Sequence, residues 1–147
     1  MEHRIGGLEK QNITGNISYD PDNHELMVKV RQEKVDKIAD SIPLQKIDSG
    51  KQQGKVLVLG WGSTYGAVHE ALDILHKEGS SANMLHLNEL WPFPAKTVVD
   101  ALSKARNSYV IENNATGQLV RLIKTETGYD VGGRILKYDG RPFTPSY

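Results

Sequence analysis

A glycine-rich loop is the first segment of this chain whose residue types suit a binding site. Residues 60–66 read GWGSTYG and join a predicted strand to a predicted helix. Glycines at such a turn let backbone amides approach a phosphate at the helix N-terminus. The spacing is a variant of the dinucleotide fingerprint, and Glu89 follows the next strand, where a ribose-binding acid would lie. The candidate ligand or interface contacts in this loop are Gly60, Gly62, Ser63, Thr64 and Gly66.

The same glycines also have a structural explanation, because they permit a tight turn and close packing of helix on sheet. Trp61 is bulky for a pyrophosphate site. The predicted sheet is also too short for the two mononucleotide-binding halves of a dinucleotide domain. We therefore favour the structural explanation over nicotinamide dinucleotide binding, with a small nucleotide-binding domain as the alternative.

A second polar group follows another predicted strand. Glu112, Asn113 and Asn114 stand at its carboxyl end, which in open α/β sheets faces the ligand crevice. Asn114 is also a good N-cap for the next helix, but capping by one residue leaves Glu112 and Asn113 unexplained. We interpret all three as candidate contacts with a ligand or a neighbouring subunit.

Two aromatic residues stand between prolines in the segment WPFP at 91–94. Such a rigid apolar knob suits an interface anchor. It suits a lid over the domain's own core equally well. Both alternatives stay open for Trp91 and Phe93, and an interaction module that docks through them is a further functional alternative.

We identify no catalytic residue and no metal site in the sequence. His69 and His76 lie on one predicted helix, and two helical turns would place them about 10 Å apart, too far for one metal. Ser63 lacks the Gly-x-Ser-x-Gly context of a nucleophile. The chain contains no cysteine, which excludes disulfides and cysteine-ligated clusters within it.

Charge and hydropathy narrow the class of protein further. The 18 basic and 18 acidic residues balance, so no overall field favours nucleic acid or an anionic membrane. No apolar run approaches the ~20 residues that span a bilayer. The first residues lack the apolar core of a signal peptide. We expect a cytoplasmic protein that binds neither nucleic acid nor membrane.

The pattern along the chain predicts two parts. Residues 1–43 should form a loop and a linker helix that starts at Asp20-Pro21 and ends before Pro43. Its narrow apolar seam should pack on the α/β domain or on a second copy of the chain; the seam residues are Val28, Val35, Ile38 and Ile42.

Residues 44–147 should form one α/β domain. From residue 55 onward, apolar strand-like runs alternate with amphipathic helical stretches. This alternation predicts right-handed crossovers and a mostly parallel sheet with helices on both faces. The predicted strands are 55–60, 84–87, 108–111 and 134–138, and helices are predicted over 64–78, from Pro94 onward and over 116–126.

Taken in order, the motifs of this chain resemble one enzyme subunit. They are GLE at 7–9, ISYDPDNH at 17–24, MVKVRQEKV at 27–35, the loop at 60–66, LWPFP at 90–94, ENN at 112–114 and GQL at 117–119. As a set, over nearly the whole chain, they resemble the C-terminal part of the alpha subunit of 2-oxoacid:ferredoxin oxidoreductases, in particular the 2-oxoglutarate type.

The resemblance implies a transketolase C-terminal-like fold. This is a three-layer α/β/α domain with a mostly parallel five-stranded sheet. Its first strand is antiparallel, so Leu44–Ile47 would pair with Lys55–Gly60. The implied reaction is oxidative decarboxylation of a 2-oxoacid with coenzyme A, giving an acyl-CoA, carbon dioxide and reduced ferredoxin.

The resemblance also implies which parts of the enzyme lie elsewhere. The whole enzyme uses thiamine diphosphate, magnesium and iron–sulfur clusters. The family's diphosphate and magnesium motif lies in the beta subunit, and its thiamine-contacting residues lie in an N-terminal domain of the alpha subunit. We therefore expect a fragment that binds none of these cofactors and is inactive alone. Its expected role is assembly with the beta subunit and the rest of the alpha subunit, in a complex that reduces ferredoxin.

Overall fold

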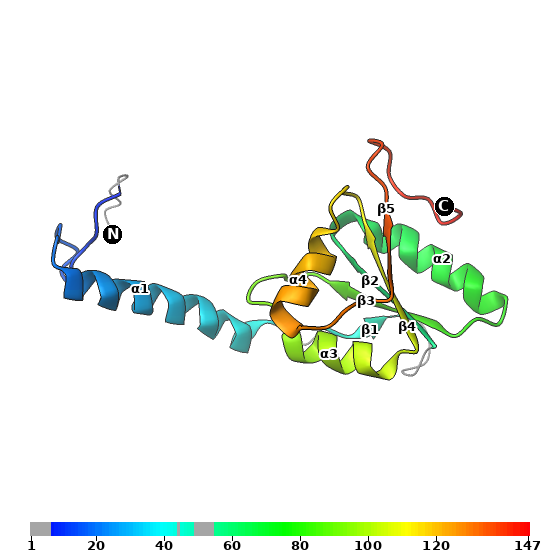
Figure 1. Cartoon of the computed structure of the whole chain (residues 1–147), viewed down its shortest axis with the longest axis horizontal. Coiled ribbons are helices and arrows are strands. Elements are labelled where there is room, and N and C mark those ends of the chain that lie inside the picture. The colour runs from blue at the N-terminus through cyan, green and yellow to red at the C-terminus, as the bar shows by residue number, and fades with distance from the viewer. Residues whose placement is uncertain (1–6, 44, 49–54) are drawn as a thin grey trace. The chain divides into compact units, whose positions relative to one another are not determined.

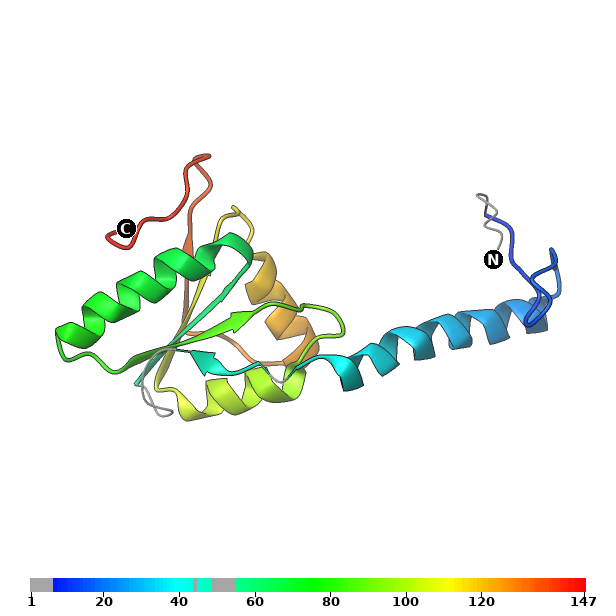
Figure 2. The same cartoon turned by 180° about the vertical axis from the view of Figure 1, so that it is seen from behind.

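The computed structural model describes residues 7–43, 45–48 and 55–147 (Figures 1 and 2). The chain divides into two compact units, Met1–Ile42 and Pro43–Tyr147. None of the helices in the described ranges is long and apolar enough to cross a membrane.

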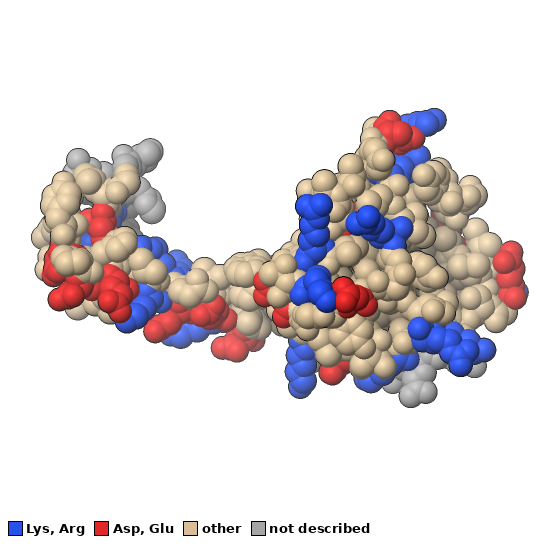
Figure 3. Space-filling model, viewed as in Figure 1, with Lys and Arg blue, Asp and Glu red and all other residues tan. Residues whose placement is uncertain are grey.

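The first unit is built on helix α1, Pro21–Asp36. The helix starts as predicted, because the Asp20 carboxylate accepts a hydrogen bond from the Asp22 amide at 3.0 Å and Pro21 occupies the first turn. It ends earlier than predicted and continues as a 3-10 helix, η1, over Lys37–Ser41. No α1 residue is buried, and basic and acidic side chains both lie along the helix (Figure 3). Packing of its apolar seam on another surface stays a prediction.

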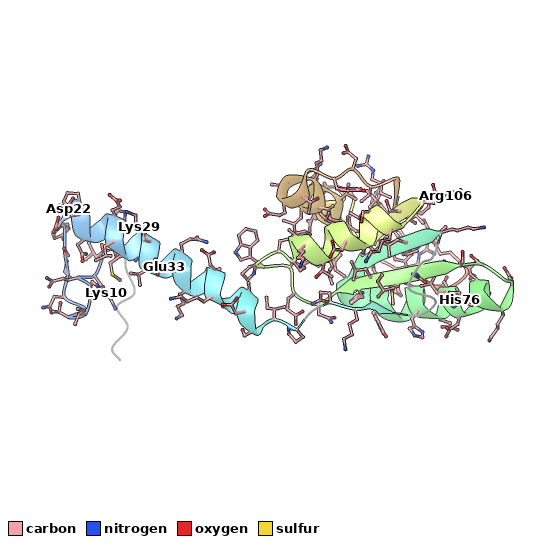
Figure 4. The ribbon with its side chains drawn as sticks, turned by 90° about the horizontal axis from the view of Figure 1, so that it is seen from below. Lys10, Asp22, Lys29, Glu33, His76 and Arg106 are labelled. Atoms are coloured by element: carbon pink, nitrogen blue, oxygen red, sulfur yellow. The ribbon has the colours of Figure 1, made fainter. Side chains whose placement is uncertain are left out.

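A charged cluster holds the preceding segment against α1. The Glu9 carboxylate accepts two hydrogen bonds from Arg31, both at 2.9 Å, and lies 2.8 Å from His24 Nδ1. Figure 4 shows Lys10 beside the first turns of α1, where its carbonyl accepts a hydrogen bond from Asn23 at 3.0 Å. The Arg31 guanidinium is the largest cause that lowers the pKa of Glu9, to about 2.

The second unit contains a five-stranded sheet in the order β1-β3-β2-β4-β5. The neighbouring pairs within β2–β5 are parallel, as the alternating pattern predicted. The strands are β1 Ile47–Asp48, β2 Val56–Trp61, β3 Ala82–Leu87, β4 Asn107–Glu112 and β5 Gly133–Leu136.

Helices cover both faces of this sheet and confirm the three-layer α/β/α architecture. On one face, Val68 and Leu72 of α2 form a buried cluster with Ala82 and Met84 of β3. The larger buried cluster lies on the other face and includes residues of α3 and α4. The helices are α2 Tyr65–Lys77, α3 Ala95–Lys104 and α4 Gln118–Thr127, and the 3-10 helix η2, Gly62–Thr64, precedes α2.

The predicted partner of the first strand was wrong. The expected strand Leu44–Ile47 was assigned to Lys55–Gly60, but Ile47 and Asp48 pair antiparallel with Leu85 and Met84 of β3. The reason is that β2 is hydrogen-bonded to β3 on one side and β4 on the other, so neither of its edges is open. Leu44 lies outside the described residues.

Removing Arg31 should release the Glu9 carboxylate. The folded pKa of about 2 lies below the ordinary 4.5. The contribution of ionised Glu9 to holding its segment is therefore fully present above pH 4.5 and is lost as pH falls through about 2. In Arg31→Ala, a carboxyl NMR titration should show the Glu9 pKa rising towards 4.5. Lys29→Ala, which removes the neighbouring pair with Glu25, is the control and should leave the Glu9 pKa in place. An unchanged Glu9 pKa in Arg31→Ala would show that another group holds the carboxylate.

Candidate functional site

Three hollows follow one another along the edge where the parallel strands end. They are open to solvent, with volumes of about 400, 820 and 380 Å³. The first and second share Gly62, and the first and third share Ser63 and Asn113. The first is lined by Trp61, Gly62, Ser63, Thr64, Asn113, Asn114 and Gln118, so it joins the glycine loop to the polar group that follows β4.

Glu112 lies beneath this edge and is fully buried. Its carboxylate accepts hydrogen bonds from the Trp61 indole at 3.2 Å and from the Asn114 side chain at 2.7 Å. It also accepts from the amides of Leu119 at 2.9 Å and Val120 at 3.3 Å. All four partners donate, which suits a carboxylate whose oxygens only accept. Burial of this acid is therefore compensated by hydrogen bonds from three separate segments.

The start of α4 is capped twice. An α-helix leaves its first four amides without intrahelical acceptors. Here Asn114 Oδ1 accepts from Gly117 at 2.7 Å and Gln118 at 3.3 Å, and Glu112 accepts from the two amides that follow. Gly117 adopts a left-handed conformation with φ of 65° to bring these groups together. From the sequence we expected only Asn114 to cap this helix. The structure shows that Glu112 caps it as well.

Asn113 is placed differently from its two neighbours. Its side chain is exposed and lines the first and third hollows. Its one recorded hydrogen bond, to the Lys137 carbonyl, is long at 3.5 Å. Contact of Glu112, Asn113 or Asn114 with a ligand or subunit stays a prediction, and of the three Asn113 has the side chain most open to such a contact.

The loop glycines differ in whether the structure requires a glycine at their position. A Cβ on buried Gly60 would lie 2.8 Å from Thr64 Oγ1, and Gly62 has a left-handed φ of 58°. Both therefore have structural reasons to be glycine. Thr64 is buried and donates to the Trp61 carbonyl at 2.9 Å. Gly66 lies in helical backbone, and a Cβ there would meet nothing within 4 Å. Internal packing therefore does not explain Gly66.

The two aromatic residues of the segment 91–94 differ in burial. Phe93 is half-buried and packs against the larger core cluster, as a lid over the core would. Trp91 is 60% exposed. Its role as an interface anchor stays a prediction.

The described residues do not group into a site for the metals that the resemblance implies. No three His, Cys, Asp or Glu side chains come together as a metal site in the described ranges. Without a cysteine, the chain supplies no thiolate for an iron–sulfur cluster. The polar side chains that line the three hollows can bind polar groups at the sheet edge.

Among the residues that line the first and third hollows, sequence reasoning missed the side-chain amide of Gln118 and the two cations Lys137 and Arg141. Gln118 opens α4 and lines the first hollow, and Lys137 and Arg141 line the third. The one available signal was the segment KYDGR over 137–141, in which two cations flank Asp139 around a glycine turn.

Comparison with known proteins places these features in a family. Residues 54–146 match pyruvate:ferredoxin oxidoreductase core domain II. The chain is 39% identical over 131 residues to 2-oxoglutarate oxidoreductase subunit KorA of Mycobacterium tuberculosis, covering 89% of this chain and 19% of that protein. It is 31% identical over 140 residues to 2-oxoacid:ferredoxin oxidoreductase 2, subunit alpha, of Aeropyrum pernix, covering 94% and 22%.

A solved structure agrees with these relatives. The chain superposes with a TM-score of 0.86 and 31% identity on the 2-oxoglutarate:ferredoxin oxidoreductase of Magnetococcus marinus, solved with 2-oxoglutarate, coenzyme A and succinyl-CoA bound. The match covers 99% of this chain and 25% of that one. The chain thus spans about a fifth of the length of the curated relatives it matches.

Glu112→Ala should strongly destabilise the α/β unit. The change removes the acceptor for the buried Leu119 amide, the half-buried Val120 amide and the Trp61 indole, and we expect a loss of about 3 kcal/mol in the free energy of unfolding. The control Asn113→Ala removes an exposed neighbour and should stay within about 0.5 kcal/mol. Urea unfolding measures both. A loss below about 1 kcal/mol for Glu112→Ala would mean that other groups satisfy these donors.

Alanine at two loop glycines should have opposite effects on stability. Gly60→Ala forces Thr64 out of place and should cost about 1–3 kcal/mol. Gly66→Ala enters open space in a helix and should stabilise by roughly 0.5–1 kcal/mol. Thermal melts followed by circular dichroism measure both changes. A destabilising Gly66→Ala would reveal a constraint on this turn that the structure does not contain.

Proposed function

The chain belongs to the pyruvate:ferredoxin oxidoreductase core domain II family, and we propose that it serves as an assembly domain of the alpha subunit of a 2-oxoacid:ferredoxin oxidoreductase. The observation that carries this proposal is the family match over residues 54–146, together with relatives that are alpha subunits. The three-layer domain of the second unit provides the body of such a module.

We propose that the complete enzyme oxidatively decarboxylates a 2-oxoacid with coenzyme A and passes the electrons to ferredoxin. The preferred substrate is 2-oxoglutarate. This preference is supported by the name of the Mycobacterium tuberculosis relative and by the 2-oxoglutarate, coenzyme A and succinyl-CoA in the Magnetococcus marinus structure. We place the enzyme in the cytoplasm.

The cofactors belong, in this proposal, to other parts of the enzyme. Thiamine diphosphate with magnesium would supply the chemistry of decarboxylation, and iron–sulfur clusters would carry the electrons. The described residues of this chain offer no grouped metal ligands, and the chain has no thiolate. The contribution that we propose for this chain is a surface that the beta subunit and the rest of the alpha subunit contact.

The exposed indole of Trp91 is the best candidate anchor on that surface. Large aromatic side chains at the centre of an interface carry much of the binding energy. Trp91 is 60% exposed, while its neighbour Phe93 fixes the loop to the core. An anchor on a supported loop loses little conformational freedom on binding.

The alternative of a dinucleotide-type domain, in which the glycines of loop 60–66 themselves cradle a phosphate, has less support. Gly60 and Gly62 have structural roles. A helix N-terminus binds a phosphate through its free amides. At the neighbouring β4–α4 turn, the four amides at the start of α4 are already hydrogen-bonded to Glu112 and Asn114.

Reconstitution tests the proposed function. The chain should be co-expressed with the beta subunit and the preceding part of the alpha subunit. The purified complex should reduce ferredoxin when given 2-oxoglutarate and coenzyme A, and a preparation without this chain should not. The isolated chain should show no micromolar binding of thiamine diphosphate with magnesium by calorimetry. A complex that assembles and turns over equally well without this chain would contradict an assembly role.

Trp91→Ala should weaken assembly without unfolding the chain. Loss of a central aromatic anchor should weaken subunit binding by about 2 kcal/mol. The melting temperature of the chain should hardly change, because the indole is exposed. Tyr129→Ala, which removes another exposed ring, is the matched control and should not affect binding. Equal affinities for the two variants in a pull-down titration would exclude Trp91 as the anchor.

A further inference from the structure

The third hollow of the sheet edge carries positive charge that the proposed function does not use. It has a volume of about 380 Å³ and lies between η2, the end of β4 and the turn that follows β5. Its lining residues are Ser63, Asn113, Lys137, Tyr138, Gly140, Arg141 and Pro142. Lys137 and Arg141 are cations, and the lining includes no acidic side chain.

One acidic residue stands close to the two cations and fixes their positions. Asp139 accepts from Lys137 Nζ at 3.0 Å and from Arg141 Nε at 2.9 Å. Lys137 is only 9% exposed, and its Nζ also lies 4.4 Å from the centre of the Tyr147 ring. Two fixed positive charges and one negative charge leave the cluster with a net charge of +1.

The opposite wall of the hollow adds polar groups that are not engaged in capping. Ser63 is exposed in the 3-10 turn that leads into α2. This helix has 13 residues, and the side chain of Thr64, the residue before it, does not cap its start. The positive end of its dipole therefore lies near Ser63. The Asn113 side chain contributes an amide donor from the end of β4.

We propose that Ser63, Asn113, Lys137 and Arg141 form a binding site for a phosphate group. A phosphate presents several strong acceptor oxygens, so Ser63 and Asn113 on one wall and Lys137 and Arg141 on the other can each donate to a different oxygen. Buried Lys137 supplies a positioned charge, and Arg141 keeps one guanidinium nitrogen, Nη1, outside its recorded contacts with Asp139. This proposal is independent of the assembly role.

The bound phosphate could belong to free phosphate or to a nucleoside phosphate. The two ligands differ in whether they would also occupy the neighbouring first hollow. The first hollow shares Ser63 and Asn113 with this site and is also lined by Trp61. A nucleoside phosphate would place its base against the Trp61 indole, whereas free phosphate would leave this residue unaffected.

NMR titration of the 147-residue chain with inorganic phosphate, at constant ionic strength in chloride, tests the site. We expect saturable shifts of the Ser63, Asn113 and Gly140 amides. Arg141→Gln should weaken binding about tenfold, because it removes a charge-assisted hydrogen bond. The control Lys124→Gln removes a cation that is likewise paired with an aspartate, Asp130, but lies outside the hollow. This variant should bind phosphate as tightly as the unmodified chain does.

A second variant and a second ligand complete the test. Ser63→Ala changes only an exposed hydroxyl and should weaken binding about threefold with an unchanged melting temperature. ADP that binds more tightly than pyrophosphate and quenches Trp61 fluorescence would identify a nucleotide phosphate, and equal affinities would identify a simple phosphate. Absence of saturable shifts at these amides, or equal losses in Arg141→Gln and Lys124→Gln, would overturn the proposal.

Discussion

The buried carboxylate of Glu112 connects the parts of the sheet edge. It stands at the end of β4, caps the start of α4 and holds the indole that ends β2. A carboxylate without partners would be costly in this position, because its burial removes it from water. With four donors around it, the same group specifies how two strands and one helix meet.

The other features of the edge follow from this arrangement. Trp61 is held by this carboxylate and lines the first hollow. With Asn114 occupied by the start of α4, Asn113 is the residue of this polar group that stays exposed. The first-turn amides of α4 are thus bound within the domain, while the residues 62–64 that lead into α2 line the first hollow. The edge therefore has a rigid structural half and a polar half that is available for contacts.

The proposed assembly role fits this division. An assembly domain needs a surface that keeps its shape before its partners bind, because ordering a loose surface would reduce affinity. The loop of Trp91 satisfies this condition, since Phe93 fixes it to the core while the indole stays exposed. In the first unit, the ion pairs of Glu9 with Arg31 hold the segment before α1 in a similar way.

Local patterns predicted most of the fold, and contacts between distant residues account for what was missed. The apolar run before Gly60 and the Asp20-Pro21 start were sufficient to predict β2 and the beginning of α1. The partner of β1 depends on strand order, which no local pattern encodes. The capping by Glu112 was missed because it reaches helix amides seven and eight residues ahead, outside the usual capping-box spacing.

The hollow at Lys137 and Arg141 was missed for the same reason. Its walls come from the turn after β5 and from a loop more than seventy positions earlier in the chain, and only the parallel sheet brings them together. The family resemblance, by contrast, was recognisable from short motifs, because their order along the chain is itself specific.

Native-state hydrogen exchange at the start of α4 tests the role of Glu112 most directly. First-turn amides of a helix lack intrahelical acceptors and ordinarily exchange fast. If the carboxylate caps α4 as described, the Leu119 and Val120 amides should exchange only on global unfolding, as slowly as the core strands do. Exchange of these two amides at the rate of an uncapped first turn would contradict the account.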